Sequence, residues 1–101
     1  MELVVEACNL TSKFPVEEKY GLISQIRRCS VSIPSNIAEG KRRGTYKEFR
    51  RCLLISFGSG SELETQIEIG KRLYYAKPED YLEIESLLPE VMKILNKMIG
   101  G

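Results

Sequence analysis

The sequence contains no histidine and no tryptophan among its 101 residues. Without histidine, Ser-His-Asp and Cys-His catalytic arrangements are excluded, and so are the Glu-x-x-His ligands of di-metal sites in helical bundles. Carboxylates remain for acid–base chemistry, but Glu64 and Glu68 are followed by Lys71 and Arg72 at helical pairing distance, which is typical of a solvated ion-pair face. We therefore expect no enzymatic activity, no small-molecule substrate, no metal and no cofactor.

Long hydrophobic runs are also absent. No apolar stretch approaches the roughly 18–20 residues that cross a bilayer, and the acidic start at Glu2 does not resemble a signal peptide. We expect a cytoplasmic protein that does not enter a membrane.

Cysteine is scarce, and its spacing excludes two kinds of site. Cys8, Cys29 and Cys52 lie too far apart for a metal clamp, and an odd number gives no complete disulfide framework. Their neighbours are apolar, so we expect all three to be buried as small hydrophobic side chains.

The composition is that of a folded globular protein, with 43% hydrophobic and 29% charged residues. A chain of this length forms one domain, which we assign to residues 1–101. Its core is modest, and this favours self-association or a partner.

Apolar residues recur at helical spacing in four segments, and no strand alternation or hairpin signal is present. The four expected helices cover residues 2–13, 16–39, 45–75 and 78 onward. Gly40 is expected to end the second helix in the left-handed conformation. The third helix has the 4-3 spacing of a coiled-coil seam from Phe49 to Tyr74. Short connections predict an all-α fold, an antiparallel up-down-up-down four-helix bundle.

Three of these helices contain a residue or segment that could interrupt them. In SIPSNIAEG, residues 32–40, Pro34 costs a helix interior about 3 kcal/mol, but the apolar stripe keeps its phase and favours one kinked helix over two. Residues 61–64 have the form of a capping box, whereas the unbroken seam favours one continuous third helix. Pro89 is expected to bend the fourth helix. The small residues of the third helix are expected to let another helix approach; they are Ser56, Gly58, Ser59 and Gly60.

The net charge of +1 hides a strong segregation along the chain. Residues 27–51 contain eight bases against Glu39 and Glu48, whereas the rest of the chain is acidic. The eight bases are Arg27, Arg28, Lys41, Arg42, Arg43, Lys47, Arg50 and Arg51. Such a strip can bind phosphates, and it is equally explained by a solvated face or by ion pairs between subunits. Arg27 and Arg28 either join the strip or pair with carboxylates such as Glu62 at an interface.

Three motifs together carry a resemblance to a known family: QIRR at residues 25–28, SIPSNIAEG at 32–40 and GSGSELETQ at 58–66. With them, the chain resembles the bacterial four-helix bundle proteins known as 23S rRNA-intervening-sequence proteins. The resemblance implies a homopentameric barrel without enzymatic activity. It also suggests kinship with the accessory variability proteins of diversity-generating retroelements, which bind nucleic acid and a reverse transcriptase through a basic surface.

Two hypotheses for function follow. In the first, the protein is a non-enzymatic oligomer whose basic strip binds RNA or DNA with little sequence preference. In the second, it is a protein-interaction scaffold whose charges serve oligomer assembly or a protein partner such as a reverse transcriptase. Under either hypothesis we expect the residues around the Pro34 kink to shape a subunit contact and not an active site; they are Ser32, Pro34, Asn36, Glu39, Gly40 and Glu62.

Overall fold

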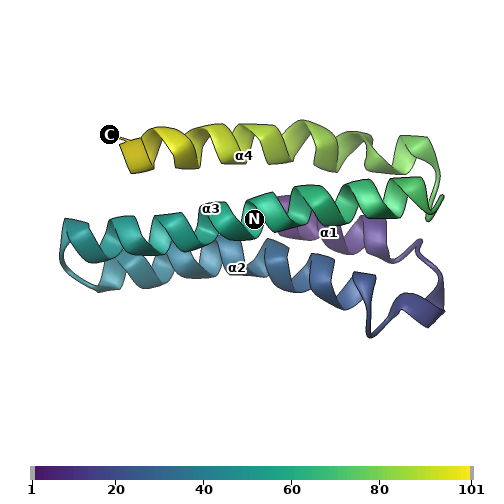
Figure 1. Ribbon diagram of the computed structural model, residues 1–101, viewed down its shortest axis with the longest axis horizontal. Coiled ribbons are helices and arrows are strands. Elements are labelled where there is room, and N and C mark those ends of the chain that lie inside the picture. The colour runs from purple at the N-terminus through teal and green to yellow at the C-terminus, as the bar shows by residue number, and fades with distance from the viewer. Residues whose placement is uncertain (1, 101) are drawn as a thin grey trace.

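The computed structural model describes residues 2–100, and all regular structure in that range is helical (Figure 1). The α-helices are α1 (Glu2–Thr11), α2 (Leu22–Arg42), α3 (Tyr46–Arg72) and α4 (Leu82–Gly100), with short 3₁₀ helices η1 (Val16–Glu18) and η2 (Pro78–Tyr81). The expected all-helical fold is confirmed. None of these helices combines the length and the apolar character needed to cross a bilayer.

The four α-helices form an elongated bundle of 43 × 24 × 18 Å. Contacts link α1 to α2, α2 to α3, α3 to α4, and α4 back to α1. In Figure 1 the colour advances from right to left along α2, from left to right along α3, and from right to left along α4. The right-hand end in that view therefore holds the start of α2 and α4, and the left-hand end holds the α2–α3 connection.

The core confirms the predicted seam of α3 over most of its length. Leu53 and Leu63 are fully buried, and each such leucine contributes about 1.5–3 kcal/mol relative to an exposed one. Gly70 is also buried, but Tyr74, the last predicted seam residue, is 90% exposed. That part of the prediction was wrong, because α3 ends at Arg72 and Tyr74 takes a positive φ of 59°.

Both predicted ends of the second helix were wrong. Residues 16–21 form η1 and a turn, and α2 begins only after Gly21, where the Glu18 carboxylate accepts a hydrogen bond from the Leu22 backbone N–H (3.3 Å). At the other end, Gly40 lies inside α2 and is buried. A Cβ on Gly40 would come within 2.8 Å of the Cys52 Cβ, so this glycine serves close packing of α2 against α3. Gly44, with φ of 84°, takes the left-handed position instead.

The helices run without interruption through the residues that could have broken them. α2 continues through Pro34 and α3 through residues 57–64, so the one-helix alternatives are confirmed for both. α4 also continues through Pro89, where the expected bend stays a prediction, as does the kink at Pro34. The polar groups near Pro34 bond within the chain: the Asn36 amide donates to the Ser32 carbonyl (2.9 Å), and the Ser32 and Ser59 hydroxyls lie 2.8 Å apart. These polar side chains therefore contact the backbone of their own helix and the Ser59 hydroxyl of α3.

Most small residues of α3 let neighbouring helices approach, as predicted. A Cβ on Gly60 would overlap the Met92 Sδ of α4, and the buried Ser56 hydroxyl donates to the Ile33 carbonyl of α2 (2.8 Å). Gly58 differs, because a Cβ there would meet no atom within 4 Å. Packing within the chain does not require that glycine.

The cysteines do not form one group. Cys52 is buried and Cys29 is partly buried, but Cys8 is exposed on α1. The prediction was wrong for Cys8. α1 buries the face that carries Leu3, Ala7 and Leu10, and Cys8 comes one residue after Ala7, so it lies outside that face.

Candidate nucleic-acid interface

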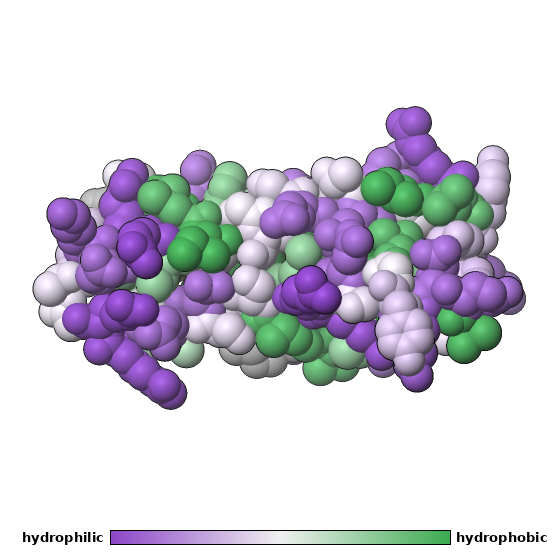
Figure 2. Space-filling model, turned by 60° about the horizontal axis from the view of Figure 1, so that its bottom comes forward, coloured by the Kyte–Doolittle hydropathy of each residue, from purple (hydrophilic) through white to green (hydrophobic). Residues whose placement is uncertain are grey.

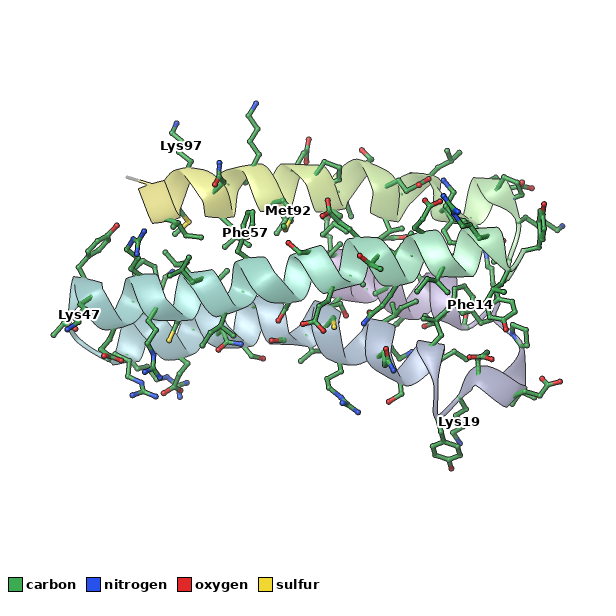
Figure 3. All side chains as sticks on the ribbon, in the orientation of Figure 1. Phe14, Lys19, Lys47, Phe57, Met92 and Lys97 are labelled. Atoms are coloured by element: carbon green, nitrogen blue, oxygen red, sulfur yellow. The ribbon has the colours of Figure 1, made fainter. Side chains whose placement is uncertain are left out.

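Six of the predicted phosphate-binding residues come together at one end of the bundle, which we call the basic end. They lie on the last turn of α2, in the connection, and on the first two turns of α3, and all six are exposed: Lys41, Arg42, Arg43, Lys47, Arg50 and Arg51. Figure 3 shows Lys47 at this end, with the nitrogen atoms of several side chains gathered around it.

The local fold explains part of this arrangement. Gly44 reverses the chain, and Thr45 caps α3 by accepting a hydrogen bond from the Glu48 backbone N–H (3.3 Å). Lys41 and Arg42 occupy the last turn of α2, where cations interact favourably with the negative end of the helix dipole. The helix dipole is therefore a structural reason for basic residues at the end of α2, besides any role in binding.

Few of these cations are neutralised by carboxylates. Arg43 pairs with Glu39 (3.0 Å) and Arg51 approaches Glu48 (4.0 Å), each within a single exposed helix segment. Pairs of this kind contribute about 0.3–0.5 kcal/mol. The remaining four, Lys41, Arg42, Lys47 and Arg50, form no ion pair with any residue in the range 2–100. The basic end thus carries uncompensated positive charge.

Two side chains of α3 connect the basic end to the end of α4. The Arg50 Nε donates to the Ile99 carbonyl (3.1 Å), and the Tyr46 hydroxyl donates to the Met98 carbonyl (3.4 Å). The Tyr46 ring is still 56% exposed and lines an open hollow of about 280 Å³ together with Lys41. An exposed aromatic ring among cations is an arrangement on which nucleic-acid bases can stack.

Sequence reasoning missed two residues of this end. Tyr46 could have been found, since it is an aromatic residue inside the basic run KRRGTYKEFRR. Lys97 of α4 could not, because only the packing of α4 beside α3 brings it to the same end (Figure 3).

Arg27 and Arg28 lie apart from the basic end. They precede Lys41 by more than a dozen residues on α2, a distance of about 20 Å along a helix. The Arg27 Nε donates to the buried Thr11 hydroxyl of α1 (2.8 Å), which fixes this side chain in helix packing. Arg28 lines a different hollow, between α2 and α3, together with Glu62.

The six residues expected at a subunit contact differ in burial and in the contacts that they make. Glu39 of α2 forms an ion pair with Arg43, the residue that follows this helix, and Gly40 is buried against α3. Pro34 lines a small apolar hollow with Leu3 of α1. Of the six, Glu62 is exposed and forms no ion pair within residues 2–100.

Groups with shifted pKa values lie toward the opposite end of the bundle. A hydrogen bond from Lys13, followed by one from the Lys77 backbone, holds the pKa of Asp80 below its ordinary value. Burial raises the pKa of Tyr81 to about 12. The hydrogen bond to Glu85 raises the pKa of Lys71. The Asp80 and Lys71 shifts accompany contacts between segments far apart in the sequence, and the Tyr81 shift accompanies burial in the core.

A comparison with protein families decides the affiliation. The family model for the 23S rRNA-intervening sequence protein matches residues 1–97. The chain belongs to this family. A search of the curated proteins gave no match.

The resemblance stated from sequence motifs is therefore confirmed. In this family member, the three motifs lie on α2 and on the middle of α3, where these two helices contact each other, whereas the basic end lies beyond them along the bundle.

Proposed function

We propose that this protein is a non-enzymatic, homo-oligomeric bundle that binds single-stranded RNA or DNA through its basic end, with little sequence preference. The observation that supports this function is a set of four exposed cations that have no carboxylate partner within residues 2–100: Lys41, Arg42, Lys47 and Arg50. Phosphates bind such cations and release counterions, which gives affinity without reading the base sequence.

Tyr46 supports a single strand over a duplex. Its ring is exposed beside Lys41, and unpaired bases present aromatic faces that a duplex keeps stacked. In this proposal phosphates contact the lysine and arginine side chains, while one base stacks on the tyrosine ring.

Assembly belongs to the same proposal. We take the up-down-up-down bundle as the protomer of a homopentameric barrel, which is what the family resemblance implies. Repeating the basic end in each copy would let one strand contact several protomers, and linked contacts raise overall affinity without any new kind of interaction.

A scaffold function is the second candidate. It is favoured by Arg28 and Glu62, which carry opposite charges, line the same hollow and have no ion-pair partner within residues 2–100. In that case the charges serve contacts between proteins, and nucleic acid binds weakly or not at all.

Fluorescence anisotropy with labelled single-stranded RNA and duplex DNA tests the leading function. Titrations from about 50 to 200 mM salt should show a steep loss of affinity, since each phosphate contact adds about 0.7 to the slope for a single strand. The triple variant K41E/R42E/K47E should lose at least about a hundredfold in affinity and flatten the slope. Its circular dichroism spectrum should match the wild type.

The matched control is K19E/R72E/K77E, a triple charge reversal of exposed bases at the opposite end. It makes the same change in net charge and should bind within a few-fold of the wild type. Absence of binding at the lowest salt, or equal losses in both triple variants, would overturn the proposed function.

A further inference from the structure

The outer side of the α2–α3 pair contains a polar hollow that the chain leaves open. Its volume is about 390 Å³, and it lies between the middle of α2 and the middle of α3. Ser32 and Ser59 close its floor by bonding to each other, and Arg28 and Glu62 stand at its rim as exposed side chains. The charged groups of the hollow are thus accessible, whereas its serines are already satisfied.

Gln66 is the second observation. This side chain lines the hollow, is only 8% exposed, and its buried Oε1 has no hydrogen-bond partner. Its Nε2 makes only long contacts, to the Gln25 Oε1 (3.5 Å) and the Cys29 Sγ (3.4 Å). Exchanging the amide oxygen and nitrogen would leave the nitrogen without an acceptor instead. A buried polar group of this kind is destabilising unless something outside the chain bonds to it.

Glu62 and Gln66 together define what could bond there. They are four residues apart on α3, so they lie one turn apart on the same side of the helix. The Glu62 carboxylate is an exposed acceptor, and once the Gln66 side chain turns toward the hollow its amide oxygen supplies a second one, so that the planar guanidinium fork can engage both. The group that fits the rim is therefore an arginine side chain.

The rest of the face has the character of a protein contact. Leu54 and Ile55 toward one end of α3, and Ile69 and Leu73 toward the other, are each 43–51% exposed. Figure 2 brings the α2 side forward and shows green patches toward both ends of the molecule, separated by a paler and more hydrophilic centre. A few hydrophobic side chains around a polar centre can exclude water from a central ion pair.

Gly58 lies on the same side of α3 and adds a steric argument. A glycine inside a helix is less favourable than alanine, and a Cβ at this position would meet no atom of residues 2–100 within 4 Å. The open space above Gly58 permits another helix to approach closely.

We propose that the α2–α3 face binds a second copy of this chain, and that Arg28 of one copy bonds to Glu62 and the orphaned Gln66 oxygen of the next. The charge pattern argues for this occupant, because the chain carries the guanidinium on α2 and its acceptors on α3, so that the α2 side of one copy can meet the α3 side of the next in the head-to-tail arrangement that closes into a ring. A stable contact needs about 800 Å² from each copy. That is roughly one eighth of the 6501 Å² exposed by the chain. The inference rests on the self-association in the proposed function and is independent of nucleic-acid binding.

Sedimentation velocity over a range of protein concentrations tests the contact, using wild type, R28E, E62R and the double variant R28E/E62R. Each single charge reversal places like charges opposite each other and should raise the dissociation constant of assembly at least tenfold. The double variant should restore the wild-type dissociation constant. E64R is the matched control, since Glu64 is exposed two residues from Glu62 but lines a different hollow, with Leu88 of α4. It should assemble as the wild type does.

Gly58→Leu gives an independent test, because the larger side chain meets no atom of its own chain at Cβ and should block only the approach of another copy. It should sediment as a monomer with an unchanged circular dichroism spectrum. Wild-type assembly that survives R28E, E62R and Gly58→Leu alike would overturn this contact alone. Failure of R28E/E62R to recover assembly would overturn the Arg28–Glu62 pairing.

A wild type that is monomeric at every concentration would overturn both this contact and the oligomeric part of the proposed function. Anisotropy titrations of the same samples report nucleic-acid binding separately, so the two failures are distinguishable.

Discussion

The two ends of the bundle use charged residues in different ways. At the end where α1 finishes and α4 begins, ion pairs join different helices: Lys13 of the α1–η1 connection bonds to Asp80 of η2 (2.7 Å), and Lys71 of α3 bonds to Glu85 of α4 (2.6 Å). At the basic end, the carboxylate contacts that the six bases make within residues 2–100 lie in a single helix or beside it. Charge at the first end connects helices, whereas most charge at the basic end remains available to a ligand.

The aromatic residues follow the same division. Phe14 packs between Tyr75 and Tyr81, with ring centroids 5.4 and 6.4 Å away, and Tyr81 is 1% exposed with its hydroxyl donating to the Tyr75 carbonyl. Tyr46 at the basic end also bonds to a backbone carbonyl, but more than half of its surface faces solvent. Similar hydrogen bonds thus accompany a core tyrosine at one end and an accessible tyrosine at the other.

The largest expected effect comes from removing the buried tyrosine. Tyr81→Ala leaves a cavity beside Phe14 and an unsatisfied carbonyl, and should lower the free energy of unfolding by about 3–5 kcal/mol. Urea denaturation followed by circular dichroism measures this loss. Tyr46→Ala, the same change at an exposed position, should cost less than about 1 kcal/mol. Comparable losses in the two variants would contradict the division of the tyrosines into core and surface.

A smaller effect is expected when the exposed tyrosine is changed and binding is measured. Tyr46→Leu removes the stacking ring and should weaken binding of single-stranded RNA about tenfold, since stacking contributes about 1–3 kcal/mol per base. Anisotropy against duplex DNA should change much less.

Two matched variants sharpen that test. Tyr46→Phe keeps the ring and loses only the bond to Met98, so it should bind as the wild type does. Tyr74→Leu changes a tyrosine that is 90% exposed but lies outside the basic end, and it should also have no effect. Loss of binding in Tyr74→Leu would indicate that an exposed tyrosine contributes to RNA binding wherever it lies, and not only at the basic end.

The smallest effect concerns Asp80 and its dependence on pH. Because Lys13 and the Lys77 N–H hold the pKa of Asp80 below its ordinary value of 3.8, the folded state prefers the carboxylate. Its stabilising contribution is present above pH 3.8 and is lost as pH falls through the lowered pKa. The melting temperature of Asp80→Asn should therefore lie below that of the wild type at pH 7, and the gap should close under acid conditions.

Glu39→Gln is the control from the basic end, since within residues 2–100 Glu39 pairs with Arg43, four positions further along the chain, and with no other helix. Its melting temperature should follow the wild type at every pH. A gap for Asp80→Asn that stays constant down to pH 2 would show that the charge of Asp80 does not hold the α1–η1 connection and η2 together.

Glycine shows clearly where sequence reasoning succeeded and where it failed. Periodicity placed Gly60 and Gly70 on the buried seam of α3, because that pattern depends only on residues three and four apart. Gly40 looked like a helix end, and it is a packing position that only the approach of Cys52 reveals. From the sequence alone a glycine can mark either the end of a helix or a position of close packing. Only the position of the neighbouring helix decides between these two roles.

The candidate site was predictable to a similar extent. Lys41, Arg42, Lys47 and Arg50 follow one another closely in sequence, so any hairpin of helices would bring them together. Arg27 belongs to the same basic stretch but contacts Thr11 of α1, which no local pattern indicates.

The sequence by itself determined the four helices, the seam of α3 and the concentration of bases around residues 41–51, because each of these depends on neighbours within a few positions. The tertiary structure decided which charges are neutralised. Lys13 meets Asp80 across sixty-seven positions, whereas Lys47 meets no carboxylate within residues 2–100, since ion pairing depends on distances that only the packed helices set.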